Sequence, residues 1–558
     1  MPQSQQTIDR RSFLKGSALL GGAAAVMGLA GCAAPASGAA DLASTGVLPE
    51  WDEEFDFVVV GGGCASYAAA LAANNGASTL LVDKGDTYGG TTAFSGNGMW
   101  VPGSWLMAEA AKENPDIDPD TEASIPEIVE YALACDAYGT ADPELVTDYV
   151  THISSVLKKF GEEMGVEYIM GPLADYYGLP GAKFGRQVSF AKDGAMTAGN
   201  TFVQITDPLI KQTGVEVRTK TPATKLYRDE TGAVVGLQVE TGSKTSNIKA
   251  NKGVLLNTGG FDHNAEMVAT YLRGPILGSN AVLTNTGDGH KMGAAIGAEL
   301  GNMACVWGTP FYITADDAPI SENLVDWFTW RGGDHSIIVN KYGKRFGDET
   351  SSYPSTNLTY YQYSTRTYEL ENIPAFHIGD QSFVAMYGYP GVAAEETNAT
   401  QGAQAEGLPE WVKTYDNLEE LARDNGIDPD GLAAEVERWN AFCEEGADGD
   451  FNRPSSNWPF GIFFPHDEAN PCMGKIEQPP FFCAKIGPGT CGTSGGLKVN
   501  ADAQVIDVNG EIIPGLYASG NCSCGYFGAA YPGPGSTVGA GVYRALRAAN
   551  HAIGLDYV

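Results

Sequence analysis

The alternation of apolar and polar stretches is clearest just after residue 50. Residues 55–60 (FDFVVV) and residues 79–82 (TLLV) are short apolar runs typical of fully buried strands. Between them lie a glycine-rich turn, GGGCAS at 61–66, and an alanine-rich stretch at 67–76 that favours a helix. The chain therefore predicts a strand, a tight turn, a helix and a second, parallel strand.

An acidic residue, Asp83, follows the second apolar run, 22 positions after Gly61. In a βαβ unit a carboxylate at this place binds the ribose hydroxyls of a dinucleotide. Gly61 permits the tight turn, Gly63 lets a pyrophosphate approach, and the helix N-terminus favours its negative charge. Ser66 stands where glycine or alanine is usual, so we expect a slightly looser contact between helix and strand. The pattern predicts a dinucleotide site.

A second loop rich in glycine and hydroxyl groups follows at residues 89–96 (GGTTAFSG). It favours a flavin over a nicotinamide, because a flavin ring has to be held beyond the pyrophosphate. Further motifs are LLNTGG at 255–260, NTGDG at 285–289, GTSGGL at 492–497 and PGLYASGN at 514–521. The candidate cofactor contacts from these loops are Gly90, Thr91, Thr92, Ser95, Gly96, Gly259, Asp288, Gly520 and Asn521.

In this order the six motifs resemble those of the flavoprotein family of fumarate reductases, succinate dehydrogenase flavoproteins and 3-ketosteroid dehydrogenases, over residues 51–558. The resemblance implies FAD and an α/β fold. Its Rossmann-type FAD-binding domain would consist of two pieces, 51–285 and 485–558, with an inserted α+β substrate-binding cap at 286–484. No second nucleotide motif is visible. We therefore expect a separate electron carrier, a membrane cytochrome or a quinol-linked protein, rather than direct donation by NAD(P)H.

Two segments distinguish the branches of that family. Fumarate reductases carry a catalytic arginine four residues after a glutamate, whereas this chain has Tyr353 four residues after Glu349. The second carboxylate-binding arginine, near the C-terminus, is also missing. YPGPG at 531–535 is similar to the Y-x-G-x-G of 3-ketosteroid dehydrogenases, and ADYYGLPG at 174–181 resembles their S-D-Y segment and points to Tyr176.

The resemblance therefore implies chemistry at the carbon–carbon bond next to a ketone of a steroid-like substrate, either dehydrogenation or the reverse, enone reduction. Both directions build negative charge on the ketone oxygen, so donors aimed at it lower the barrier. The expected donors are the Tyr531 hydroxyl and the Gly535 N–H. Tyr353 is the expected proton-transfer residue, and we expect Tyr176 to lower its pKa.

Several alternatives stay open. YPGPG also fits a tight structural turn, and tyrosines are commonly packing residues. A flavin-dependent reductase of an unsaturated carboxylate, such as fumarate, urocanate or a cinnamate, is the alternative enzyme. A surface lipoprotein that captures a ligand or relays electrons is the alternative that is not an enzyme.

Composition narrows the class of protein. Of the 558 residues 43% are hydrophobic and 71 are glycine, which indicates a globular chain. The net charge of −34 argues against a nucleic-acid partner, because such binding needs basic patches. The ten cysteines include no C-x-x-C pair, so we expect small buried side chains and no metal site. Cys522-x-Cys524 leaves a disulfide or a metal open.

The first 32 residues are typical of an export signal. Arg10 and Arg11 precede a short apolar run that ends in LAGC at 29–32, a sequence that looks like a lipoprotein processing box. We expect export by the twin-arginine route, a lipid anchor at Cys32 on the outer face of the membrane, and a flexible tether at 33–50. An uncleaved apolar tail is the alternative.

Overall fold

The computed structural model describes residues 48–557 except 198, 316–317, 324, 326–331, 394–407 and 456–469. Residues 43–558 form one compact unit. The twin arginines, Cys32 and nearly all of the expected tether lie outside the described residues. No helix within the described ranges is long and apolar enough to cross a membrane.

The larger of the two main sheets is built on the predicted βαβ unit. Its strand order is β22-β23-β10-β1-β2-β7, with β9 also pairing with β10 and β8 with β9. The bounds are β1 (Glu53–Val60), β2 (Thr79–Val82), β7 (Glu216–Arg218), β8 (Ala223–Arg228), β9 (Val234–Thr241), β10 (Lys244–Leu256), β22 (Gln504–Ile506) and β23 (Ile512–Ala518). Strands β7, β2, β1, β10 and β23 are parallel. Their apolar runs fit a parallel sheet because its two faces are covered.

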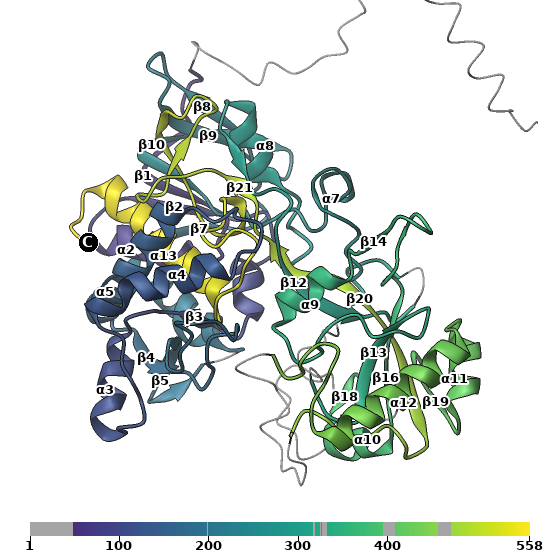
Figure 1. The fold of residues 1–558 in the computed structure, drawn as a ribbon. Coiled ribbons are helices and arrows are strands. Elements are labelled where there is room, and N and C mark those ends of the chain that lie inside the picture. Colours follow the sequence, from purple (N-terminus) through teal and green to yellow (C-terminus); the bar gives the residue numbers. More distant parts are fainter. Residues whose placement is uncertain are drawn as a thin grey trace, which may run out of the picture. The chain divides into compact units, whose positions relative to one another are not determined.

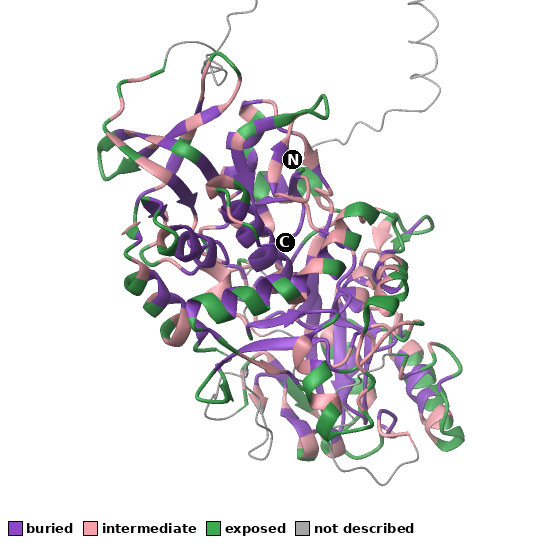
Figure 2. Ribbon diagram, turned by 90° about the vertical axis from the view of Figure 1, so that its left-hand side faces the viewer, coloured by how far each residue is buried: buried purple, intermediate pink, exposed green. Residues whose placement is uncertain are grey.

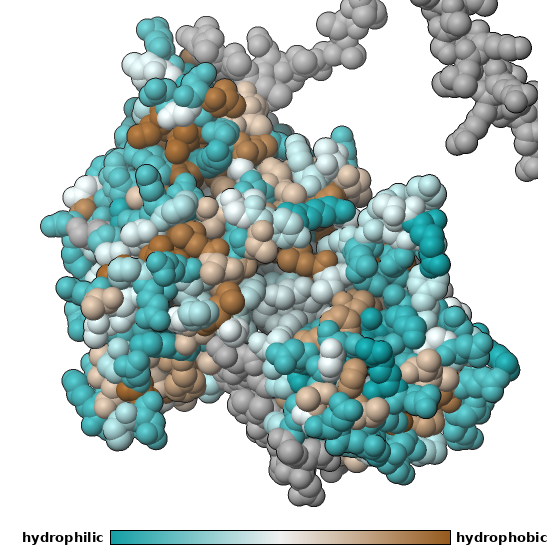
Figure 3. Space-filling view, in the orientation of Figure 1, coloured by the Kyte–Doolittle hydropathy of each residue, from teal (hydrophilic) through white to brown (hydrophobic). Residues whose placement is uncertain are grey.

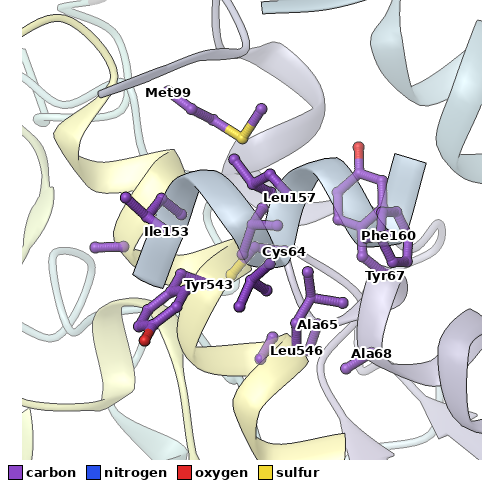
Figure 4. Packing of buried hydrophobic residues seen from close by; sticks show 14 of the residues in the cluster. Cys64, Ala65, Tyr67, Ala68, Met99, Ile153, Leu157, Phe160, Tyr543 and Leu546 are labelled. Atoms are coloured by element: carbon purple, nitrogen blue, oxygen red, sulfur yellow. The ribbon is translucent and has the colours of Figure 1, made fainter. Parts of the chain in front are cut away.

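Three helices form a packed layer beside this sheet: α2 (Ser66–Asn74), α5 (Pro143–Met164) and α13 (Ser536–Ile553). Helix α5 begins where the Asp142 carboxylate accepts the N–H groups of Glu144 and Leu145, and it ends at Gly165 in the left-handed conformation. Figure 4 shows Ala65 and Tyr67 of the turn and α2 against Leu157 and Phe160 of α5, with Tyr543 and Leu546 of α13 beside them.

A second sheet is antiparallel, in the order β12-β20-β16-β13, with β19 also pairing with β20. Its strands are β12 (Val306–Tyr312), β13 (Ser336–Asn340), β16 (Ala375–Gly379), β19 (Val412–Tyr415) and β20 (Phe481–Thr493). Its helices are α9 (Tyr353–Thr359), α10 (Gln381–Tyr387), α11 (Leu418–Asn425) and α12 (Pro429–Glu445). We call residues 306–493 the cap; Figure 1 draws this region on the right. The predicted boundary at residue 485 falls inside β20, and the domain boundaries stay a prediction.

A smaller sheet, β3-β5-β4 with β6 beside β5, carries cavity residues such as Gln187. Its strands are β3 (Gly98–Trp100), β4 (Glu167–Met170), β5 (Gln187–Lys192) and β6 (Ala195–Met196). The remaining helices are α3 (Trp105–Glu113), α4 (Ile125–Ala134), α6 (Asp207–Thr213), α7 (Ala265–Tyr271) and α8 (Asp288–Ala295). Figure 2 shows buried strands in the interior and exposed residues along the outer helices. Hydrophilic residues predominate over α11 and α12 on the face seen in Figure 3.

Candidate active site

One large cavity, of about 1160 Å³, contains nearly all the residues that the sequence singles out. Its walls come from the carboxyl ends of β1 and β2, from the β3–β5 sheet, from the N-terminus of α13, and from β12 and α9 of the cap. The predicted site residues that line it are Gly61, Gly63, Asp83, Gly90, Thr91, Thr92, Ser95, Gly96, Tyr176, Gly259, Asp288, Tyr353, Gly520, Asn521, Tyr531 and Gly535.

Ser66 is the one predicted site residue that does not line this cavity. Its side chain is buried, and its hydroxyl donates to the carbonyl of Gly62 at 2.6 Å. The hydroxyl therefore stays inside the first turn of α2.

The glycine turn after β1 fixes the carboxylate of Asp83. Gly61 has φ +96°, and a Cβ there would lie 2.2 Å from the carbonyl oxygen of Asn257, so only glycine fits. The N–H of Gly62 donates to Asp83 Oδ2 at 2.9 Å, and the N–H of Gly85 donates to Oδ1 at 2.7 Å. The carboxylate is thus held at the edge of the cavity, ready to accept from ribose hydroxyls.

Lys84 and Asp288 form an ion pair in the wall beside this carboxylate. The Lys84 ammonium donates to Asp288 Oδ2 at 2.5 Å and to Thr286 Oγ1 at 2.6 Å. Among the described lining residues Lys84 is the only lysine, and none is an arginine. The cation is therefore compensated within the wall.

Three tyrosines from segments far apart in the sequence meet at the other end of the cavity. Ring centroids lie 5.4 Å apart for Tyr176 and Tyr353, 5.5 Å for Tyr353 and Tyr531, and 5.8 Å for Tyr176 and Tyr531. All three side chains are buried against the protein. We call these three residues the tyrosine cluster.

Tyr177, the neighbour of Tyr176, does not line the cavity. The sequence alone does not separate these two adjacent phenols, and the geometry of the loop does. Tyr176 packs with Tyr353 and Tyr531, whereas the N–H of Tyr177 donates to the Tyr131 hydroxyl at 3.3 Å.

The two glycines of YPGPG are required by packing. A Cβ at Gly533 would lie 2.3 Å from the Trp100 ring, and one at Gly535, which has φ +82°, would lie 2.0 Å from the carbonyl oxygen of Gly98. Two neighbouring groups donate to the carbonyl of Pro532: the N–H of Tyr176 at 3.0 Å and the hydroxyl of Tyr131 at 2.6 Å. The segment is thus a tight turn and a wall of the cavity at once, so the two interpretations of it are compatible.

Burial dominates the electrostatics of the tyrosine cluster. It raises the pKa of Tyr353 well above its ordinary value, and the neighbouring phenols Tyr176 and Tyr531 raise it further. Burial also raises the pKa of Tyr531, although the neighbouring hydroxyls of Thr537 and Tyr353 oppose this rise. The expectation that Tyr176 lowers the pKa of Tyr353 is wrong for this structure, because Tyr176 adds to the rise that burial causes.

Sequence reasoning missed several residues of this region. Thr537, in the first turn of α13, lines the cavity, and its buried hydroxyl has no hydrogen-bond partner among the described residues. Trp307 of β12 donates from Nε1 to Asn521 Oδ1 at 2.9 Å, and its ring lies edge-on to Tyr531 at 5.3 Å. Cys491 of β20 also lines the cavity. Each is a single residue without a spacing pattern, so no local signal marked it.

The cysteines form no disulfide bridge among the described residues. Cys522 is buried, and its thiol contacts the carbonyl of Leu256 at 3.1 Å. No group of three or more potential metal ligands occurs among the residues that the structure describes. Cys522 is therefore part of the packing between the glycine loops.

The chain matches the family described as "FAD binding domain" over residues 56–538. The chain belongs to this family. It is 31% identical to 3-oxosteroid 1-dehydrogenase of Mycobacterium tuberculosis over 569 aligned positions, covering 89% of this chain and 98% of that protein. It is 27% identical to digoxin reductase of Eggerthella lenta, covering 92% and 91%.

Among solved structures, the chain resembles 3-ketosteroid delta1-dehydrogenase of Sterolibacterium denitrificans in complex with 1,4-androstadiene-3,17-dione. The TM-score is 0.79 at 27% identity, covering 90% of this chain and 99% of that one. These matches confirm the predicted family, the α/β fold of FAD-binding flavoenzymes, FAD as the cofactor and the enzyme class. This flavoprotein is an FAD-dependent oxidoreductase that acts on CH–CH bonds.

The cavity residues fit FAD. The anchored carboxylate of Asp83 suits a ribose, and the N-terminus of α2 suits a pyrophosphate. A Cβ at Gly96 would meet no protein atom within 4 Å, and one at Gly90 would meet only Gly63, at 3.9 Å. A side chain at either position would extend into free space beside the cavity, and the two glycines leave that space open.

Proposed function

We propose that this flavoprotein oxidises or reduces the carbon–carbon bond next to the ketone of a steroid-like substrate. The observation that carries the proposal is the composition of the cavity wall: the tyrosine cluster and Gly535 lie together, and no described lining residue is an arginine. A dicarboxylate needs paired cationic donors, whereas a ketone needs neutral ones.

The bound FAD supplies hydride acceptance or donation at one carbon of the bond. The protein's part is to stabilise the charge that develops on the ketone oxygen. The Tyr531 hydroxyl and the Gly535 N–H are the donors proposed for this role. The first N–H groups of α13, which have no partner inside the helix, add the positive end of its dipole at the same wall.

Tyr353 is proposed to move the proton at the carbon next to the carbonyl. Its raised pKa keeps the phenol protonated at neutral pH. A protonated phenol donates readily to an enolate carbon, which is the step of enone reduction. In dehydrogenation the same oxygen has to accept the proton, so that direction depends on the phenolate and gains from alkaline pH.

The proposed substrate class rests on the relatives and on the apolar part of the cavity wall. Two of the named relatives are enzymes of 3-oxosteroids or 3-ketosteroids, and the third is a reductase of digoxin. Apolar side chains also line the cavity, among them Phe94, Leu173, Met196 and Leu283. Such a wall supports burial of a ring system of low polarity.

Anaerobic stopped-flow absorbance of the holoenzyme tests the proposal. Saturated 3-ketosteroids should reduce the oxidised flavin, which lowers its visible absorbance. A 3-ketosteroid with a double bond next to the ketone, such as 1,4-androstadiene-3,17-dione, should reoxidise the reduced flavin. Fumarate, urocanate and cinnamate, the substrates of the alternative enzyme, should do neither. Rapid reoxidation by a carboxylate but not by an enone overturns the proposal.

The Tyr531→Phe variant supplies the matched test of the site. It should keep its FAD and lose about 100-fold or more in the rate of flavin reduction, the usual effect of removing one donor from a developing oxyanion. Full activity would remove the proposed role of this hydroxyl.

We further propose that the enzyme is exported and anchored by lipid at Cys32. A separate electron carrier would donate electrons to its flavin or accept electrons from it. The support is the sequence of residues 1–32 and the single nucleotide motif. Mass spectrometry of the protein isolated from membranes should find an acylated N-terminus at Cys32. An N-terminus at Met1 would contradict the anchor.

A further inference from the structure

We infer that Asp175 is a positioning residue that holds the YPGPG turn against the loop of Tyr176 and thereby sets the place of Tyr531. The inference rests on the proposed function, because it explains how the proposed donor to the ketone oxygen is held. Asp175 directly precedes Tyr176 in the chain but does not line the cavity. Its side chain is buried, so its carboxylate can act on the site only through other residues.

The carboxylate of Asp175 accepts hydrogen bonds on both oxygens. Oδ1 accepts from Trp100 Nε1 at 2.7 Å, and Oδ2 accepts from the N–H of Lys183 at 3.0 Å and from Arg186 Nη1 at 2.5 Å. Burial raises the pKa of Asp175 to about 6, and the charge of Arg186 opposes this rise. At neutral pH the carboxylate is therefore mainly ionised, and each of its oxygens can accept from these donors.

The bonds on Oδ2 close the loop that carries Tyr176. The N–H of Asp175 also donates to the carbonyl of Lys183 at 3.0 Å, so the two ends of residues 175–183 meet. Arg186 donates to the carbonyl of Gly181 inside this loop at 2.8 Å. One carboxylate therefore fastens the base of the loop at the residue next to Tyr176.

The bond on Oδ1 connects the same carboxylate to the YPGPG turn. Gly533 packs so closely here that a Cβ would lie 2.3 Å from the Trp100 ring and 2.9 Å from Asp175 Oδ1. The N–H of Tyr176 donates to the carbonyl of Pro532 at 3.0 Å. The turn is thus held at two consecutive residues, by Asp175 and by its neighbour in the chain. We call Asp175, Trp100 and Gly533 the buried junction.

The buried junction fixes two of the three phenols relative to each other. The rings of Tyr176 and Tyr531 stack at a centroid distance of 5.8 Å and an angle of 22°. Tyr176 follows Asp175 in the chain, and Tyr531 lies two residues before Gly533. Tyr353 comes from the cap and is not held by these contacts. Loss of the carboxylate should therefore displace the Tyr531 hydroxyl from the tyrosine cluster.

Asp175→Asn breaks this connection without leaving a buried cation unpaired. An amide has a single acceptor oxygen, so it can serve either Trp100 or the side of Lys183 and Arg186, but not both. Arg186 keeps its two bonds to Asp120, from Nε to Oδ2 at 2.7 Å and from Nη2 to Oδ1 at 2.9 Å. The variant also keeps the size of the side chain, so we expect it to fold.

Hydrogen exchange of the holoenzyme tests the buried junction without any substrate. In Asp175→Asn, the amides of residues 176–183 and 533–536 should exchange about two- to tenfold faster than in the wild type, the effect of losing one hydrogen bond. Asp380→Asn is the matched control in the cap, because its carboxylate is also buried and accepts four backbone N–H groups. Unchanged exchange of residues 533–536 in Asp175→Asn, or equal acceleration there in Asp380→Asn, overturns the inference.

Kinetics then test the consequence for catalysis. Asp175→Asn should keep its FAD and its KM while kcat falls about 10- to 100-fold, since a misplaced donor costs rate rather than binding. Asp380→Asn should keep the kcat of the wild type, because neither Asp380 nor the residues whose N–H groups it accepts line the cavity. Equal losses of kcat in the two variants would indicate a general loss of stability and overturn the positioning role.

Trp100→Phe tests the buried junction from a second member, and it decides the matter if Asp175→Asn does not fold. This variant loses the Nε1 donor but keeps an aromatic ring beside Tyr149 and Phe527. It should show the same faster exchange at residues 533–536 and a lower kcat at unchanged KM. A folded Trp100→Phe variant with the exchange and the kcat of the wild type contradicts the inference.

Failure of this inference and failure of the proposed function are distinguishable. If 3-ketosteroids fail to reduce the flavin of the wild type, the proposed function fails while the exchange result still decides on Asp175. If Tyr531→Phe is inactive but Asp175→Asn has the kcat of the wild type, the proposed function stands and the positioning role is wrong.

Discussion

The two ends of the cavity are built in opposite ways. The ribose end comes from one continuous piece of chain, β1, the glycine turn, α2 and β2, which ends at Asp83. The tyrosine cluster comes from three distant segments: Tyr176 lies between β4 and β5, Tyr353 begins α9 of the cap, and Tyr531 precedes α13. The geometry of the ribose end is set by residues that are neighbours in the chain. The geometry of the tyrosine cluster depends on contacts between segments far apart in the chain.

Charge differs between the two ends as well. At the ribose end a carboxylate accepts two backbone N–H groups, and Lys84 is paired with Asp288. At the tyrosine cluster the groups are phenols, and burial raises the pKa of Tyr353 and Tyr531. The ribose end is suited to hold a cofactor permanently. The tyrosine end is suited to stabilise negative charge that develops on a substrate only during the reaction. Variants at either end should therefore separate binding of FAD from turnover.

Tyr353→Phe should produce the largest effect at the tyrosine end. The variant should keep its FAD but lose about 10²- to 10⁴-fold in flavin reduction, the range for removing a proton-transfer group. Tyr360→Phe, near the other end of α9, is the control, because the buried Tyr360 hydroxyl has no hydrogen-bond partner among the described residues. Stopped-flow absorbance measures both, and equal losses would show that only packing in α9 matters.

Gly535→Ala should weaken the tyrosine end through its backbone. A Cβ there meets the carbonyl of Gly98 in a left-handed conformation, so we expect a loss of about 3 kcal/mol in the free energy of unfolding. Gly554→Ala at the other end of α13 is the matched control: it is also left-handed, but no atom lies within 4 Å. That variant should lose about 1 kcal/mol. Chemical denaturation measures the difference, and similar losses would contradict the packing argument.

Asp83→Asn should affect the ribose end alone. The amide keeps the size of the side chain but loses the charge that accepts strongly from hydroxyl and N–H groups, so FAD affinity should fall about 10- to 100-fold. With saturating FAD, kcat should match the wild type. Fluorescence titration of the apoprotein with FAD checks the first statement, and a lower kcat at saturation would break the separation of the two ends.

The direction of the reaction should respond to pH. Because the pKa of Tyr353 is raised, its phenolate fraction grows about tenfold per pH unit across the neutral range. The rate of dehydrogenation should rise with pH by up to that factor, whereas enone reduction should stay flat between about pH 6 and 8. Stopped-flow absorbance measures the rates of both half-reactions as a function of pH. A dehydrogenation rate independent of pH would contradict the role of Tyr353 as the proton acceptor.

The ribose end could be predicted from sequence because its elements are neighbours in the chain. The apolar runs, Gly61 and Asp83 fix one another at short range, and the structure reproduces the unit in parallel register. The meeting of Tyr176, Tyr353 and Tyr531 was predicted only through a family resemblance. No local pattern relates residues so far apart.

Two expectations concern properties that depend on tertiary contacts, which the sequence alone does not give. Gly535 was expected as a donor through its N–H, and the structure adds that protein atoms lie where a Cβ of Gly533 or Gly535 would stand. The pKa of Tyr353 was expected to be lowered by Tyr176, but burial raises it, and the second phenol adds to the shift. Both depend on which atoms from distant parts of the chain pack against the residue. The choice between Tyr176 and Tyr177 depends in the same way on the conformation of the loop.

The lack of a described arginine in the cavity wall also bears on how fast a ligand arrives. Long-range attraction speeds association only where uncompensated charge faces the solvent path, and it weakens as salt is added. Here the wall's lysine is paired and the reacting end is made of phenols. A neutral ring ketone should therefore associate at a rate that ionic strength hardly changes, although the chain as a whole carries a net charge of −34.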